Sequence, residues 1–185
     1  FNNIDRNLAY EDIKKLSTKY HKNINVLNVL SQIAQKMGDV DTTINSLKKI
    51  LLIDKSNIEC ISKIYKLLLN KSLLDEALAN INLILRIDKD HYEAIRDKAY
   101  VYFLKNNFDK AKKYIDNILK LEEKDFFAHN IKGLIYFKNS NFHEAKNYFE
   151  QAIKINSKYV DSYNNLGICL IELEKLDEAY TVCID

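Results

Sequence analysis

The sequence repeats itself every 34 residues, and this period constrains the fold more than any other feature of the chain. Alanines mark the period, and they are Ala77, Ala111, Ala145 and Ala179. The same phase extends back to Thr43 and Ala9 without an insertion or a deletion. A fixed period of about 20 to 50 residues is typical of solenoids and other repeat arrays. We therefore expect a row of similar structural units along the whole chain.

Each period predicts two amphipathic helices. A second small residue lies 12 positions before each marker, except at Tyr65, and these residues are Ser31, Ala99, Gly133 and Gly167. Apolar residues follow the marker four positions later, and they are Ile13, Leu47, Ile81, Ile115, Phe149 and Cys183. This spacing keeps apolar side chains on one helix face, and small residues allow two helices to approach closely. Turn residues separate the two helices at Gly38, Ser72, Asn106, Ser140 and Glu174.

The composition agrees with a folded helical protein. The chain has no proline and three glycines, which argues against β-sandwiches and glycine-rich phosphate loops. Hydrophobic residues make up 47% and charged residues 29%, so the chain is not a disordered tail. Apolar runs such as Ile50–Ile53 are much shorter than a membrane span, so we expect no direct membrane insertion.

The charge balance argues against nucleic acid as a partner. Twenty-eight basic residues face 26 acidic ones, which leaves a net charge of +2. Only Arg6, Arg86 and Arg96 are arginines, the residue type that forms bidentate hydrogen bonds to phosphate and guanine. A protein partner is therefore expected instead.

Cysteines and histidines show no pattern of catalytic or metal-binding chemistry. Cys60, Cys169 and Cys183 are odd in number and lack C-x-x-C spacing, so we expect inert core thiols and favour the cytoplasm. The histidines are scattered at His21, His91, His129 and His143. No pair combines with a carboxylate in zinc-like spacing. We expect no cofactor, no metal and no enzymatic activity in this segment.

The repeats resemble the tetratricopeptide repeat family, whose unit is a 34-residue helix-turn-helix. The match is strongest at Asn165–Gly167 with Leu176–Ala179, and at Lys132–Gly133 with Phe142–Ala145. The resemblance implies an all-α fold, a right-handed superhelical solenoid of antiparallel helix pairs. It divides a single continuous array into the second helix of a preceding repeat at 1–23, complete repeats at 24–57, 58–91, 92–125 and 126–159, and a shortened repeat at 160–185.

The resemblance also implies that the first helices of the pairs line a concave face that binds peptides. Early in the chain this face is rich in amides and lysines, at Asn25, Asn28, Gln32, Gln35, Lys63 and Lys66. The later face is more apolar, and it provides the candidate peptide-binding residues Arg96, Tyr100, Phe103, Phe127, Asn130, Ile131, Leu134, Phe137, Asn164, Asn165 and Ile168. Internal packing is an alternative role for Phe103 and Phe137 above all, and also for Leu134 and Ile131. Replacement of Leu134 or Ile131 by glutamate is expected to abolish peptide capture without changing stability.

Two family subtypes narrow the expected ligand. The subtype that grips the terminal carboxylate of chaperones is excluded, because Glu93 and Asp97 occupy its matching positions and would repel a carboxylate. The subtype that precedes protein O-glycosyltransferase domains uses one asparagine per repeat, and only Asn165 matches it. The expected function is a non-catalytic scaffold that binds a peptide or helix of a partner protein. Two alternatives remain: a substrate-recruiting region of a larger enzyme, and self-assembly as a homo-oligomer through the C-terminal edge at Cys183 and Ile184.

Overall fold

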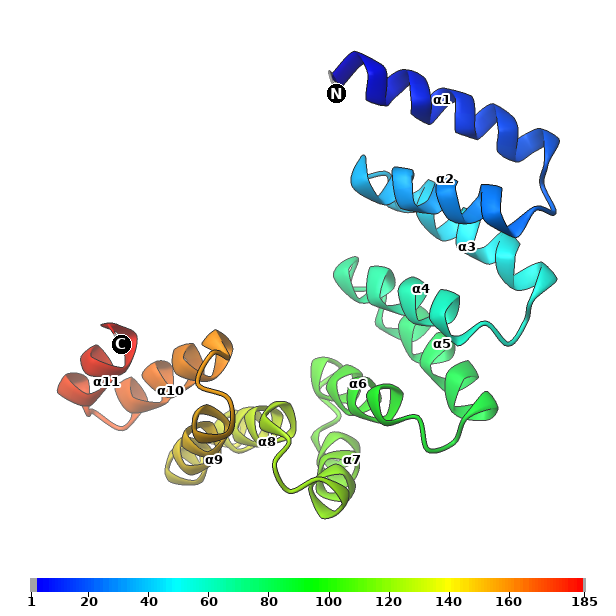
Figure 1. The fold of residues 1–185 in the computed structure, drawn as a ribbon. Helices are drawn as coiled ribbons and strands as arrows, with labels where there is room; N and C mark the ends of the chain where they lie inside the picture. Colours follow the sequence, from blue (N-terminus) through cyan, green and yellow to red (C-terminus); the bar gives the residue numbers. More distant parts are fainter. Residues whose placement is uncertain (1–2, 185) are drawn as a thin grey trace. The chain divides into compact units, whose positions relative to one another are not determined.

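The computed structural model describes residues 3–184, and all regular secondary structure within that range is α-helical (Figure 1). The helices form two compact units that divide between His91 and Tyr92. The expected all-α solenoid of helix pairs is thereby confirmed. Within the described range, no helix has the length and apolar character needed to cross a membrane.

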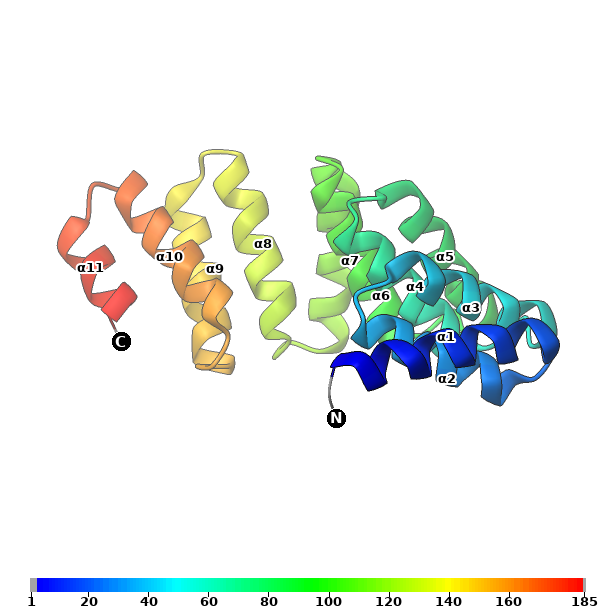
Figure 2. The same ribbon diagram turned by 90° about the horizontal axis from the view of Figure 1, so that it is seen from above.

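Successive helices pack as hairpins within each unit (Figures 1 and 2). Unit 1 contains α1 (Asn3–Lys19), α2 (Ile24–Lys36), α3 (Val40–Ile53), α4 (Ile58–Asn70) and α5 (Leu74–Ile87). Unit 2 contains α6 (Tyr92–Leu104), α7 (Phe108–Leu121), α8 (Phe126–Lys138), α9 (Phe142–Ile155), α10 (Val160–Glu172) and α11 (Leu176–Ile184). In unit 2, α8 contacts both α6 and α10, so the first helices of three hairpins lie side by side.

The turn inside each hairpin contains one residue with a left-handed backbone. The φ angle is 75° at Gly38, 59° at Ser72, 55° at Asn106, 59° at Ser140 and 60° at Glu174. These residues lie at the predicted turns, and the left-handed cap expected for glycine and asparagine is confirmed at Gly38 and Asn106. For a residue other than glycine this conformation costs about 1 to 2 kcal/mol, which the packing of the two helices must offset.

Close contact between the paired helices occurs at the small residues. Ala99, Ala111 and Ala145 are fully buried. Gly133 in α8 lies against the ring of Phe149 in α9, and a Cβ atom at Gly133 would be 2.6 Å from Phe149 Cε1. The glycine therefore leaves the space that the phenylalanine ring fills.

The first helix departs from the predicted phase. Ala9 is exposed, whereas the next residue, Tyr10, is 7% exposed and packs against Leu30 and Ala34 of α2. The prediction that Ala9 marks a buried contact is wrong. The reason is that α1 packs on α2 alone within the described structure, so its buried face is set by that one neighbour.

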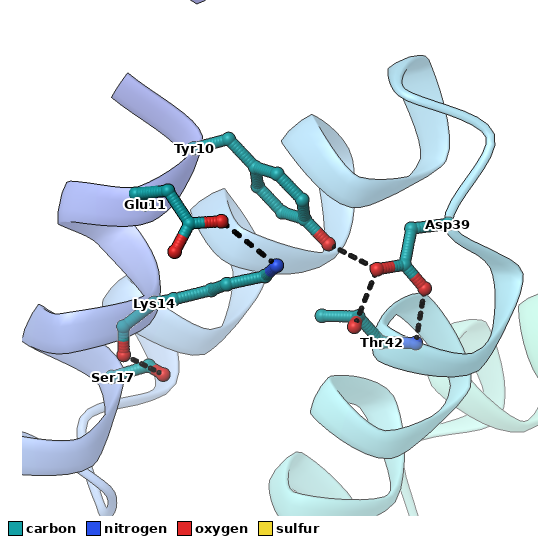
Figure 3. A network of polar contacts seen from close by, with 6 residues as sticks. All are labelled: Tyr10, Glu11, Lys14, Ser17, Asp39 and Thr42. Atoms are coloured by element: carbon teal, nitrogen blue, oxygen red, sulfur yellow. Dashed lines mark hydrogen bonds and ion pairs between the residues drawn. The ribbon is translucent and has the colours of Figure 1, made fainter. Parts of the chain in front are cut away.

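Tyr10 also connects α1 to the start of α3 (Figure 3). Its hydroxyl donates to Asp39 Oδ2 over 2.6 Å. Asp39 is the N-cap of α3, and it accepts from the Thr42 backbone N–H (2.9 Å) and the Thr42 hydroxyl (2.8 Å). Chiefly through the bond from Tyr10, and then those from Thr42, the pKa of Asp39 falls from 3.8 to about 2. The charged N-cap Asp39 thus links α1 to the start of α3.

The contact between α7 and α8 includes an ion pair beside its aliphatic core. Lys132 of α8 pairs with Asp116 of α7 at 2.7 Å, and its side chain is only 15% exposed. Tyr136 of α8 stacks on Tyr148 of α9 at 5.3 Å between ring centroids. The residues 34 positions after Lys132 and Tyr136 are the buried Leu166 and Leu170 of α10. The same helix face therefore uses an ion pair and stacked rings in one repeat, and aliphatic packing in the next.

Candidate functional site

A groove runs along the first helices of unit 2 and consists of two adjoining pockets. The larger one, here called the aromatic pocket, has a volume of about 330 Å³ and is lined by Tyr100, Phe127, Asn130, Ile131, Leu134, Tyr159, Asp161, Asn164 and Asn165. The second one, the aliphatic pocket, has about 210 Å³ and is lined by Leu134, Phe137, Lys138, Phe149, Asn165 and Ile168. Leu134 and Asn165 border both pockets, so the two form one continuous surface, the unit 2 groove.

Aromatic rings from three segments form the walls of the aromatic pocket. Tyr100 of α6 and Phe127 of α8 meet edge to face with centroids 5.7 Å apart. Tyr159, in the turn before α10, is held edge to face by Phe126 at 4.9 Å. Phe103 stacks on Tyr100 at 6.4 Å and supports that ring. These contacts fix the rings, so the pocket needs little rearrangement to accept a ligand.

The floor of the groove is polar and tightly bonded. Asn130 is 2% exposed, and its Oδ1 accepts hydrogen bonds from Ser162 Oγ and Asn165 Nδ2, both at 3.0 Å. These bonds tie α8 to α10 and orient the Asn165 amide between the two pockets. Asn164 lies exposed at the rim. The groove therefore combines apolar walls with amide groups, which can pair with a peptide backbone.

Charged groups lie at the aromatic pocket. The Arg96 guanidinium is 5.0 Å from the centroid of the Phe127 ring, and its Nε lies 3.6 Å from Asp97 Oδ1. Burial, and next the nearby charge of Asp161, raise the pKa of Tyr159 and also that of Tyr100. Both phenols therefore remain protonated at neutral pH, and Tyr159 donates a hydrogen bond to Asp161.

The structure brings most of the predicted residues to this groove. Tyr100, Phe127, Asn130, Ile131, Leu134, Phe137, Asn164, Asn165 and Ile168 line one pocket or both. Arg96 lies behind Phe127, and Phe103 packs on Tyr100 and Phe108 outside both linings. Phe103 thus has the packing role named as its alternative.

Ile131 is part of the core as well as the groove. It is 1% exposed and packs with Ile115, Ile118 and Ile135. The expectation that a glutamate at Ile131 leaves stability unchanged is therefore wrong, because the carboxylate would be buried among aliphatic side chains. Leu134 also packs against the core, so the exposed Ile168 is the better position for a test.

Four lining residues of the groove were not among the predicted candidates: Lys138, Phe149, Tyr159 and Asp161. Tyr159 precedes its helix and occupies the N-cap position, where α2, α4 and α8 have Asn23, Asn57 and Asp125. A large aromatic residue in place of these capping residues was the available signal. Phe149 belongs to a second helix, and it reaches the aliphatic pocket because Gly133 has no side chain.

Unit 1 has a smaller depression, which residues of α2, α3 and α4 line. Its volume is about 160 Å³, and it is lined by Ser31, Gln32, Gln35, Thr43, Leu47, Lys63, Lys66, Leu67 and Asn70. Amide and ammonium groups predominate there, as predicted. The surface has no aromatic wall.

The cysteines that the structure describes are core residues. Cys60 and Cys169 are 4% and 0% exposed, and burial raises the pKa of each thiol. These two thiols are therefore protonated and shielded, as predicted, whereas the side chain of Cys183 lies outside the described residues. Among the described residues, no group of three or more metal-ligating side chains comes together.

Comparison with known proteins identifies the repeats. Sequence profiles of the tetratricopeptide repeat match residues 97–125, 126–159 and 148–181. A search of curated proteins finds no match to the chain.

Several solved structures share the fold. A tetratricopeptide repeat protein from Parabacteroides merdae superposes with a TM-score of 0.80 and 21% identity, over 96% of this chain and 71% of that one. MamA from Desulfovibrio magneticus RS-1 gives 0.71 and 16%, over 87% and 91%. YrrB, a TPR protein with an unusual peptide-binding site, gives 0.61 and 16%, over 94% and 89%. Residues 97–181 thus match tetratricopeptide repeats, and the same 34-residue period and left-handed turns extend through the helices before them.

Proposed function

We propose that this chain is a protein-interaction scaffold that binds an extended peptide segment of a partner protein in the unit 2 groove. The observation that carries the proposal is the continuity of the aromatic and aliphatic pockets through Leu134 and Asn165. A peptide can place side chains into successive pockets while the amides of Asn164 and Asn165 pair with its backbone. The fold shared with YrrB, which has a peptide-binding site, lends support.

The exposed apolar surface sets the expected affinity. Ile168 is 52% exposed although it borders a pocket, and Leu134 and Phe137 are partly buried. Covering three such side chains gains several kcal/mol, at about 1.5 to 3 kcal/mol for each fully buried one. Association and ordering of the peptide cost about 4 kcal/mol or more. We therefore expect dissociation constants on the order of micromolar.

The test uses a phage-displayed library of random dodecapeptides, selected on the immobilised full chain. Peptides that are enriched should bind the Ile168→Glu variant at least about tenfold more weakly, because the new carboxylate must be desolvated in the aliphatic pocket. Since Ile168 is half exposed, the substitution leaves the core intact. Isothermal titration calorimetry with synthetic copies of the enriched peptides gives the dissociation constants.

Leu176→Glu is the matched control. Leu176 is 65% exposed and belongs to α11, outside the lining of both pockets. Its replacement adds the same charge to the same unit, and peptide affinity should stay at the wild-type value. Equal binding of the enriched peptides by the wild type and Ile168→Glu would show that the unit 2 groove is not the binding site.

A further inference from the structure

The aromatic pocket has a chemistry that the rest of the groove lacks. Three of its lining residues are the aromatic Tyr100, Phe127 and Tyr159, and the carboxylate of Asp161 lies among them. Its volume of about 330 Å³ is at the lower end for ligand sites, which span about 300 to 1,000 Å³. The space therefore fits one long side chain better than a complete small molecule.

The electrostatics at this pocket favour a positive charge. The faces of aromatic rings carry negative potential, and a cation near a ring face gains about 0.5 to 2 kcal/mol. Asp161 adds a full negative charge beside the two phenols. Arg96, the cation closest to these rings, is already paired with Asp97.

The other cations of these three helices are directed elsewhere. Lys98 lies over the ring of Tyr114, and Lys132 pairs with Asp116 and lies over Tyr148. Lys138 borders the aliphatic pocket and not the aromatic one. No basic side chain of the described residues lines the aromatic pocket itself.

One of these rings, that of Phe127, already contacts a cation within the protein. The Arg96 guanidinium lies 5.0 Å from the centroid of Phe127, whose ring also borders the pocket. A ligand cation on the pocket side would have Asp161 as its carboxylate partner, just as Arg96 has Asp97.

From this arrangement we infer that the aromatic pocket recognises an arginine or lysine side chain of the bound peptide, held between the rings of Tyr100, Phe127 and Tyr159 and the carboxylate of Asp161. The inference rests on the proposed function, since the same peptide must place an apolar side chain in the aliphatic pocket. It specifies the ligand class as an extended peptide with a basic residue a short distance from an apolar one.

Sequencing of the enriched dodecapeptides is the first test. We expect arginine or lysine at a fixed distance from an apolar residue in the selected pool. A synthetic enriched peptide in which norleucine replaces the basic residue should bind about tenfold more weakly. A pool without basic residues would overturn the inference. A pool enriched in acidic residues, which could pair with Arg96, would also overturn it.

A double-mutant cycle then assigns the preference to Asp161. Asp161→Asn should weaken binding of the basic peptide about tenfold and leave binding of the norleucine peptide unchanged. Asp161 is exposed, so the substitution does not disturb the core. Asp177→Asn, which removes an exposed carboxylate from α11, is the control and should change neither affinity. Equal weakening of both peptides by Asp161→Asn would overturn the inference.

The two proposals fail in different ways. If the enriched peptides lose affinity for Ile168→Glu but show no preference for a basic residue, the groove remains the peptide site and the inferred cation pocket is wrong. If the peptides do not distinguish Ile168→Glu from the wild type, both proposals are wrong.

Discussion

The two units build the same hairpins but present different chemistry on their first helices. In unit 1 this face carries Gln32, Lys63 and Lys66 around a depression of about 160 Å³. In unit 2 the corresponding face carries Tyr100, Phe127 and Leu134 around pockets of about 330 and 210 Å³. The buried hydrophobic residues of the hairpins, by contrast, are small or aliphatic in both units, apart from the rings of Tyr10, Tyr65 and Phe149. The residue types that recur every 34 positions thus maintain the fold. The residues of the first helices that differ between the units determine what each unit can bind.

The largest expected effect concerns the close contact between α8 and α9 of unit 2, which depends on Gly133. Gly133→Ala would place a methyl group 2.6 Å from the ring of Phe149, which is itself fully buried and would have to shift. Overpacking of this kind costs about 1 to 3 kcal/mol, against a gain in helix propensity of about 1 kcal/mol. We expect a net loss of up to about 2 kcal/mol in the free energy of unfolding, measured by urea denaturation.

Ser31→Ala tests the equivalent position of unit 1. Ser31 donates a hydrogen bond to the Asn28 carbonyl within its own helix, so its loss should change stability by less than about 0.5 kcal/mol. If Gly133→Ala were as harmless as Ser31→Ala, the proposed close contact in unit 2 would be wrong.

The next effect concerns the amide floor, which distinguishes the unit 2 groove from unit 1. Asn130→Ala leaves the buried Ser162 hydroxyl and the Asn165 amide without their acceptor. We expect a loss of about 1 to 3 kcal/mol in stability and a weaker interaction with enriched peptides. Thermal melting and calorimetry measure the two effects. Asn164→Ala, at the exposed rim, should leave the melting temperature within about 1 °C; an equal effect of both variants would argue against a bonded floor.

A third prediction tests the charged cap of unit 1. Because the pKa of Asp39 is about 2 in the folded protein and 3.8 ordinarily, this residue stabilises the fold above pH 4. The contribution disappears as the pH falls through 2. Tyr10→Phe removes the principal cause of the shift and should raise the Asp39 pKa, with a cost of about 1 kcal/mol at pH 7. An NMR titration of the Asp39 carboxyl would contradict this if its pKa stayed near 2 in the variant.

The smallest expected effect compares one ion pair from each unit. Lys71 and Asp41 lie 2.6 Å apart with side chains 38% and 80% exposed, whereas the Lys132 side chain in the pair with Asp116 is 15% exposed. Asp41→Asn should cost less than about 0.5 kcal/mol and Asp116→Asn about 1 kcal/mol. Urea denaturation at low and high salt measures both, and a larger loss for Asp41→Asn would reverse the expected order.

The sequence was sufficient for the features that depend on spacing. The sequence predicted the helix pairs, the turns from Gly38 to Glu174, and the small residues at the contacts. These features follow from the local chain and its nearest hairpin partner. The Ala9 phase was wrong because burial in α1 depends on which neighbour is present, and spacing alone does not specify that.

The groove was predicted only in part because it depends on side chains that meet across helices. The first-helix positions identified Tyr100, Phe127 and Leu134, which the structure brings together. Tyr159 lies outside those helices, and the bond between Asn130 and Asn165 joins residues of different repeats. The 34-residue period predicts neither the burial of Ile131 nor the grouping of aromatic rings around Asp161.

The most direct test of the account is to map a bound peptide by NMR. Titration of the labelled full chain with an enriched dodecapeptide should shift the backbone amide signals of Asn130, Asn164, Asn165 and Ile168. The signals of Gln32, Lys63 and Lys66 in unit 1 should stay unchanged. Shifts confined to those unit 1 residues, with an unperturbed unit 2 groove, would contradict the claim that unit 2 holds the peptide site.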